Sequence, residues 1–149
     1  YRDNNLPLLR RLSLTKIGRE TVHRHASLHP GAFTVVRDRS LRVATIGRTF
    51  LDMIREPDLC GGMHHVLDAY QEHAGKYIQL IADDIDRHGT KIEKVRAGYI
   101  LEERLGLSHE AISKWEKFAQ RGGSRKLYAH NEYNPRFSEK WCLSLNIEE

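Results

Sequence analysis

The spacing of the apolar residues changes twice along this chain of 149 residues. In the first 45 residues, apolar and polar side chains alternate, and this two-residue period predicts short strands with one buried face. From Ile46 onward the spacing becomes helical, and from Trp141 it alternates again. The alternating pairs near the N-terminus are Leu12/Leu14, Phe33/Val35 and Leu41/Val43. Short strands, then a run of helices, then a closing strand predict an α+β domain.

About five helices are expected in the central run. The first begins at Ile46 and ends before Pro57, because proline cannot continue a helix interior. Gly61-Gly62 then lets the chain turn into the second helix. The inward positions of the five helices are Ile46, Phe50, Leu51 and Ile54; Met63, Val66, Leu67 and Tyr70; Tyr77, Leu80, Ile81 and Ile85; Ile92, Val95 and Tyr99; Ile112, Trp115 and Ala119.

Capping residues and glycines place four of the helix ends. Gly89 is expected to close the third helix. Thr90 and Glu93 have the spacing of a capping box, in which each side chain bonds the backbone N–H of the other residue, so they predict the start of the fourth helix. That helix is expected to stop at Gly106, and Ser108 to cap the fifth.

Length and composition indicate a single domain, residues 1–149, with a basic, strand-rich arm (1–40) and a helical core with its closing strand (41–149). Hydrophobic residues make up 40% and charged residues 30% of the chain, which is typical of a soluble globular protein. No apolar run approaches the ~20 residues that span a bilayer. Cys60 and Cys142 lack the spacing of a metal pair, so a reduced, cytoplasmic protein is expected. Because the chain begins with Tyr1 rather than Met, a fragment, a processed chain or further upstream residues are expected.

Positive charge is concentrated at the N-terminal end. Residues 1–48 hold ten Lys/Arg against three Asp/Glu, a net charge of +7, whereas residues 49–149 hold fourteen against seventeen, a net of −3. This asymmetry indicates an anionic partner, most often nucleic acid, although a solvated surface with no ligand accounts for it equally well. The candidate phosphate-neutralising residues are Arg10, Arg11, Lys16, Arg19, Arg24 and Arg42.

Catalytic signatures are scarce. The chain has neither of the common glycine-rich nucleotide-binding motifs, and no Ser nucleophile elbow. A nuclease core beginning at Pro57-Asp58 would need an acid followed two residues later by Lys, and no Asp or Glu here has one. We therefore expect no enzyme activity and no cofactor.

Metal sites are weaker alternatives. Asp83 and Asp86 would lie near one helix face and could hold a hard cation, but a solvated acidic face explains them better. The residues that could suggest zinc are His23 and His25, and His64 and His65 near Cys60. None has the spacing of a known zinc motif, so we expect no metal, and a metal-dependent nuclease or phosphotransferase is the least favoured function.

Three ordered motifs resemble one family. They are Arg48-Thr49-Phe50-Leu51-Asp52 continuing to Pro57-Asp58-Leu59-Cys60-Gly61-Gly62, then Arg96-Ala97-Gly98-Tyr99-Ile100-Leu101-Glu102, then Leu127 followed by Trp141-Cys142-Leu143-Ser144-Leu145-Asn146. Over residues 41–146 this pattern resembles the C-terminal domain of AbiEi-type antitoxins, the regulators of type IV abortive-infection toxin–antitoxin systems. Tyr128-Ala129 departs from it, since an acidic residue and proline are expected there.

The resemblance implies a regulatory function. Such antitoxins usually carry an N-terminal winged helix that binds operator DNA and represses their own operon, and their C-terminal domain neutralises a nucleotidyltransferase-like toxin without needing a stable complex. No winged helix is found in this chain, since Tyr1–Ile17 is too short for three helices. The expected partners are therefore the toxin, DNA mainly through a missing N-terminal domain, and no membrane. The alternative is a stand-alone basic nucleic-acid-binding domain.

The motif residues are expected to be scaffold. Arg48 lies at a helix start with Asp52 four residues later, and the helix dipole disfavours a cation there, so it should have a specific partner such as a carboxylate or strand carbonyls. Gly98 should permit close packing, Trp141 should fill the core and Asn146 should tie down the terminus. The full set of motif residues is Arg48, Thr49, Asp52, Gly61, Gly62, Arg96, Gly98, Tyr99, Glu102, Trp141 and Asn146.

Overall fold

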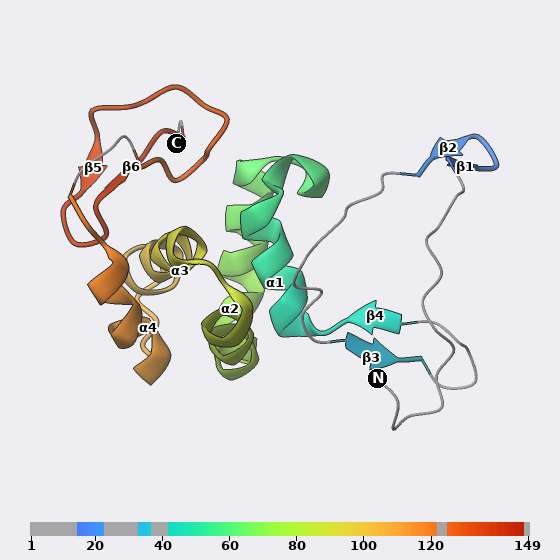
Figure 1. Cartoon of the computed structure of the whole chain (residues 1–149), viewed down its shortest axis with the longest axis horizontal. Helices are drawn as coiled ribbons and strands as arrows, with labels where there is room; N and C mark the ends of the chain where they lie inside the picture. Colours follow the sequence, from blue (N-terminus) through green and yellow to red (C-terminus); the bar gives the residue numbers. More distant parts are fainter. Residues whose placement is uncertain (1–14, 23–32, 37–41, 122–124, 148–149) are drawn as a thin grey trace.

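Helices dominate the described part of the chain (Figure 1). The structure, a computed structural model, describes residues 15–22, 33–36, 42–121 and 125–147. The four α-helices are α1 (Ile46–Arg55), α2 (Met63–His88), α3 (Lys91–Gly98) and α4 (Glu110–Trp115). Shorter helical segments are the 3₁₀ turns η1 (Pro57–Cys60) and η3 (Glu116–Phe118) and the π-helical η2 (Tyr99–Arg104). None of the described helices is long and apolar enough to cross a membrane.

The strands within the described residues form three separate antiparallel pairs. They are β1 (Lys16–Ile17) with β2 (Glu20–Thr21), β3 (Phe33–Val35) with β4 (Arg42–Ala44), and β5 (Phe137–Ser138) with β6 (Leu143–Ser144). The first two pairs lie to one side of the helices, and the third lies at the opposite end (Figure 1). The α+β class, with short N-terminal strands and a closing strand, is therefore confirmed in outline.

The predicted limits of α1 are confirmed. Thr45 caps the helix by accepting a hydrogen bond from the Arg48 backbone N–H (3.3 Å). The helix ends at Arg55, before Pro57 begins η1. Gly61 and Gly62 then adopt positive φ angles of 83° and 92°, a region that favours glycine, and α2 starts directly after them.

The second and third helices predicted from sequence follow one another without a loop as α2, and a kink at Tyr77 separates them. α2 runs for 26 residues and departs from helical geometry only at Tyr77, where φ is −116° and ψ is 17°. Gly75 costs a helix only ~1 kcal/mol relative to alanine. Burial of Ile81 and Ile85 on the same side as Tyr70 holds the two halves together across the kink.

The observed capping residues confirm the predicted start of α3 and correct the predicted cap of α4. Thr90 and Glu93 form the predicted capping box, with the Glu93 side chain accepting from the Thr90 N–H at 2.7 Å. Gly89 is the C-cap of α2, although its φ of −75° is not left-handed. The expected Ser108 cap is wrong, because His109 Nδ1 accepts from the Ala111 N–H at 3.1 Å.

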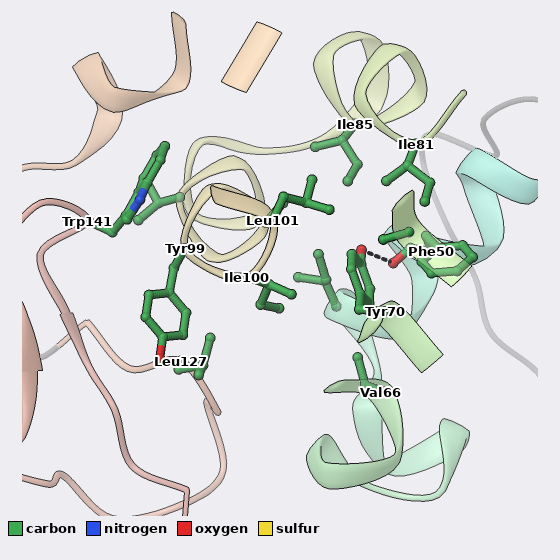
Figure 2. Close-up of a cluster of buried hydrophobic side chains, with 14 of the residues drawn as sticks. Phe50, Val66, Tyr70, Ile81, Ile85, Tyr99, Ile100, Leu101, Leu127 and Trp141 are labelled. Atoms are coloured by element: carbon green, nitrogen blue, oxygen red, sulfur yellow. Dashed lines mark hydrogen bonds between the residues drawn. The ribbon is translucent and has the colours of Figure 1, made fainter. Parts of the chain in front are cut away.

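The core lies between α1, α2, α3, η2 and the C-terminal segment (Figure 2). Phe50 and Tyr70 pack edge to face with centroids 4.8 Å apart, and the Tyr70 hydroxyl donates to the Phe50 carbonyl at 2.8 Å. Trp115 and Trp141 are fully buried. The closing segment is buried on both sides from Trp141 to Ile147, which explains why it needs only a two-residue strand.

Five residues predicted to be inward are exposed. The hairpin residues Phe33, Val35 and Val43 are exposed because no further layer of the described chain covers either face of the β3–β4 pair. Ile46 and Leu80 are exposed as well, since α1 and α2 meet on other faces. Leu12, Leu14 and Leu41 lie outside the described residues.

Candidate functional site

The first motif makes an ion-pair network between helices. Arg48, almost fully buried, places its Nε 2.7 Å from Asp52 Oδ1, so of the two expected kinds of partner the structure shows a carboxylate. Arg55 Nη1 also approaches Asp52, and its Nε donates to Glu93 Oε1 at 3.0 Å. Arg55 Nη2 donates to the His88 carbonyl at 2.8 Å. The network therefore ties α1 to the end of α2 and the start of α3.

The second half of that motif reaches a distant loop. Asp58 on η1 accepts a hydrogen bond from the Tyr128 hydroxyl on one oxygen and contacts His130 Nδ1 with the other. We call these three residues the Asp58 clasp. The hydrogen bond from Tyr128, followed by that from His130, lowers the pKa of Asp58. The clasp joins residues 70 positions apart in the sequence.

Asn146 holds the same loop from the other side. Its Oδ1 accepts from the Tyr128 N–H at 3.0 Å, and its Nδ2 donates to the carbonyls of Tyr128 (2.7 Å), Asn131 (3.2 Å) and Glu132 (3.0 Å). Asn146 was expected to tie down the terminus, and these bonds join the C-terminal segment to residues 128–132. Tyr128, which departs from the family pattern, is anchored at both its backbone and its side chain.

The middle motif packs against the closing segment. A Cβ atom on Gly98 would lie 2.2 Å from the Trp141 ring, so glycine is required for this close approach, as predicted. Arg96 Nε donates to the Lys126 carbonyl at 3.0 Å, and burial lowers the pKa of Arg96. Glu102 pairs with Lys140 at 2.8 Å.

All three motifs therefore converge on one segment, residues 125–134, which we call the presented loop. Asp58 contributes from the first motif, Arg96 from the second and Asn146 from the third. Within the loop, Lys126 Nζ donates to the Asn131 carbonyl at 2.7 Å. The loop tip, including His130, Glu132 and Tyr133, is exposed. This convergence was not predicted, because no local pattern signals contacts between segments so far apart.

A cleft beside η2 is a second feature that sequence reasoning missed. It has a volume of about 650 Å³. Ser138 Oγ donates to Glu103 Oε2 at 2.6 Å at its edge, and Tyr99, predicted to be buried, forms part of its wall. The π-helical geometry of η2 has no sequence signature. The lining residues are Gln71, Gly75, Tyr99, Glu103, Arg104, Leu105 and Leu107.

No group of three or more His, Cys, Asp or Glu side chains that could hold a metal ion occurs among the described residues. Asp83 is hydrogen-bonded to Gln79, and Asp86 accepts from Trp115 Nε1 at 2.7 Å. The latter bond lowers the pKa of Asp86. Cys60 and Cys142 are free thiols. His23 and His25 lie outside the described residues.

The candidate nucleic-acid residues fall on both N-terminal hairpins. Lys16 lies on β1, Arg19 lies in the β1–β2 turn, and both are exposed. Arg42 lies on β4 with its guanidinium 4.8 Å from the centre of the Phe33 ring. The two hairpins are well separated in Figure 1, so these cations do not form one cluster. Arg10, Arg11 and Arg24 lie outside the described residues.

Comparison with known proteins found no relative of this chain, so a functional proposal has to be based on the geometry described above. No family model, no curated protein and no solved structure matches the chain.

Proposed function

We propose that this chain is the regulatory domain of a type IV antitoxin, which neutralises a nucleotidyltransferase-like toxin and is not itself an enzyme. A DNA-binding domain elsewhere in such a protein would bind the operator and repress the operon, and this domain would support that autoregulation. The observation that carries the proposal is the convergence of three motifs on the presented loop. Motifs that hold one exposed loop in place favour a role in presenting a surface.

The chemistry of the motif residues supports this role. Arg48 forms an ion pair with Asp52 within α1, and Arg55 forms one with Glu93 on α3. Asn146 uses its amide group entirely on backbone partners, and buried amides satisfied in this way fix a single local geometry. Gly98 contributes only room for Trp141. These residues shape the chain, which leaves the exposed residues of the presented loop to contact a partner.

Co-expression with a nucleotidyltransferase-like toxin, taken from the gene beside this one where such a gene is found, tests the proposal. The wild-type protein should restore growth that the toxin arrests. Glu132→Lys and Tyr133→Ala alter the exposed tip without touching the motif contacts, so each should weaken rescue at unchanged protein level. Ser113→Ala, an exposed position on α4, is the matched control and should rescue like the wild type.

Failure of the wild-type protein to rescue growth would overturn the antitoxin function. Full rescue by both loop variants would leave the toxin system in place but reject the presented loop as the surface that acts. Protein levels and melting temperatures of the variants separate these outcomes from misfolding.

The second candidate is a basic nucleic-acid-binding domain, favoured by the exposure of Lys16 and Arg19 on the β1–β2 hairpin. Phosphate contacts without base readout give a Kd of roughly 10⁻⁴–10⁻⁶ M for duplex DNA at physiological salt. Replacing both residues with Gln should reduce the log–log salt slope by about 1.8, since each phosphate contact contributes ~0.9. Lys117→Gln on η3 is the matched control. An unchanged slope would assign both cations to a solvated surface.

A further inference from the structure

The cleft beside η2 lies between α2 and the segment that ends η2. Its volume of about 650 Å³ is in the range of sites that take small molecules. Gln71 and Gly75, four residues apart on one face of α2, contribute one side. Tyr99 and Glu103 on η2 contribute the other. Leu107 closes the cleft between them, since a Cβ atom on Gly75 would lie 3.9 Å from its side chain.

The backbone of η2 has the geometry of a π-helix beside this cleft. The Leu105 N–H donates to the Ile100 carbonyl, five residues earlier, at 3.1 Å. Single π-helical turns within α-helices are rare and occur frequently at functional sites. The position of η2 therefore favours a binding role for the cleft.

One buried side chain of the lining has an unused polar group. Tyr99 is 5% exposed, and its hydroxyl forms no hydrogen bond within the part of the chain that the structure describes. A buried tyrosine hydroxyl usually has a hydrogen-bond partner. Because Tyr99 lines the cleft, a molecule bound there can supply that partner.

Glu103 supplies a negative charge at the same place. Its Oε2 accepts a hydrogen bond from Ser138 Oγ at 2.6 Å, and its Oε1 has no partner among the described residues. The Gln71 carboxamide, on the opposite side of the cleft, is likewise without a partner in the described ranges. Arg104, the one cation among these lining residues, already has an interaction of its own.

Carboxylates outnumber cations around Glu103. Lys140 Nζ lies 2.8 Å from Glu102 Oε2 and 3.8 Å from Glu116 Oε2. The hydrogen bond to Glu102 is the largest cause that raises the pKa of Lys140, and the charges of Glu102, Glu116 and Glu103 add to it. Three carboxylates therefore act on one lysine, and a further cation beside Glu103 would reduce their mutual repulsion.

We propose that the cleft is a binding site for a small alkylammonium ion, such as a free diamine. The ammonium group donates to Glu103 Oε1 and to the Tyr99 hydroxyl, both of which accept hydrogen bonds. The half-buried side chains of Leu105 and Leu107 cover the methylene chain. The proposal is independent of the antitoxin function, since binding is measured on the chain alone.

NMR titration of the nitrogen-15-labelled chain with 1,5-diaminopentane tests the site. The amide signals of Gly75, Glu103 and Leu107 should shift together, with a Kd of about 1 mM or tighter. Two probes with the same carbon chain are the matched ligands: neutral 1,5-pentanediol and the dianion pentanedioate. Neither should shift these signals at the same concentrations, because neither carries an ammonium group.

Two variants test the residues that hold the ammonium group. Glu103→Gln keeps the side-chain shape and an acceptor for Ser138 but removes the charge, so it should weaken binding about tenfold. Tyr99→Phe keeps the ring and should weaken binding about threefold. Glu110→Gln is the matched control, since it removes an exposed carboxylate on α4, outside the cleft. It should bind like the wild type, and circular dichroism melting checks that each variant is folded.

Three results would overturn the proposal. The first is a wild-type chain whose cleft signals do not move with 1,5-diaminopentane. The second is binding that Glu103→Gln leaves unchanged, or that Glu110→Gln weakens as much, because the amine would then bind surface charge in general. The third is a shift of the same signals by pentanedioate that is lost in Arg104→Gln, which would assign the cleft to an anion.

Discussion

The helical body and the N-terminal hairpins use apolar residues in opposite ways. In the body, residues such as Leu101 and Trp141 are fully buried, and several elements contribute to each contact. In the β3–β4 hairpin, Phe33 and Val35 alternate with polar residues in the same way as buried strands do, yet both are exposed. An alternating pattern therefore buries its apolar face only where the fold supplies a second layer.

This difference predicts which region of the chain contributes most to the free energy of unfolding. Burial in a packed core contributes both apolar transfer and close contacts, whereas an exposed side chain contributes neither. The helical body should therefore unfold as one cooperative unit whose stability is insensitive to the hairpins. Substitutions in the two regions should separate sharply.

The largest difference is expected between Trp141→Ala and Phe33→Ala. Trp141 is fully buried against Gly98, so its truncation should lower the free energy of unfolding by ~3–5 kcal/mol. Phe33→Ala should change it by less than ~0.5 kcal/mol, since surface changes usually do. Urea denaturation at a concentration that keeps the chain monomeric measures both. Comparable losses at the two positions would mean that the hairpin belongs to the cooperative core.

The next effect is expected at the presented loop. Asn146→Asp keeps the side-chain shape but aims a buried carboxylate at the carbonyls of Tyr128, Asn131 and Glu132, so it should cost about 3 kcal/mol. Asn131→Asp removes one hydrogen bond, to the Asn146 carbonyl, at an exposed position and should cost about 1 kcal/mol. Urea denaturation compares the two. Equal costs would show that the loop is held by something other than the Asn146 amide.

Sequence patterns predicted features that depend on near neighbours. The Thr90–Glu93 capping box and the Arg48–Asp52 pair join residues three and four apart, so spacing alone identifies them. The Asp58 clasp joins residues 70 apart, and no periodicity reports such a contact. The three motifs were expected to be scaffold residues. Their common contact with the presented loop was not expected, because it too joins segments far apart in the sequence.

The prediction of buried positions failed where the packing of the helices differs from what the local sequence pattern indicates. The helical spacing of Leu80 predicts an inward face, but which face of α2 is covered depends on where α1 crosses it, and that crossing is set by Gly47. The helix boundary expected before Tyr77 is a kink rather than a loop, because packing of Ile81 and Ile85 continues α2 beyond it. The π-helical geometry of η2 is not indicated by any residue type in the sequence.

A smaller effect is expected at the closest backbone approach of the body. Gly98→Ala inserts a methyl group into the Trp141 ring contact and should cost ~1–3 kcal/mol. Gly75→Ala makes the same change in α2, where the nearest neighbour atom would lie at an ordinary 3.9 Å from Leu107. That substitution should stabilise by up to ~1 kcal/mol through helix propensity. Thermal melting of both variants distinguishes them by the sign of the shift, and a loss at both positions would contradict the role given to Trp141.

The smallest effect is expected from protonation of the Asp58 clasp. The hydrogen bond from Tyr128 is the largest cause that lowers the pKa of Asp58, with His130 second. A lowered pKa in the folded state means that the clasp stabilises the fold above the unfolded value of about 3.9, and that this contribution is lost as pH falls through the lower folded value. Carbon-13 NMR titration of Asp58 should therefore give a midpoint below the usual range, and Tyr128→Phe should raise it. Asp68→Asn, a change at an exposed position on α2, is the control and should leave the midpoint unchanged. An ordinary midpoint in the wild type would show that the presented loop leaves η1 in solution, and that Asn146 and Arg96 alone hold it.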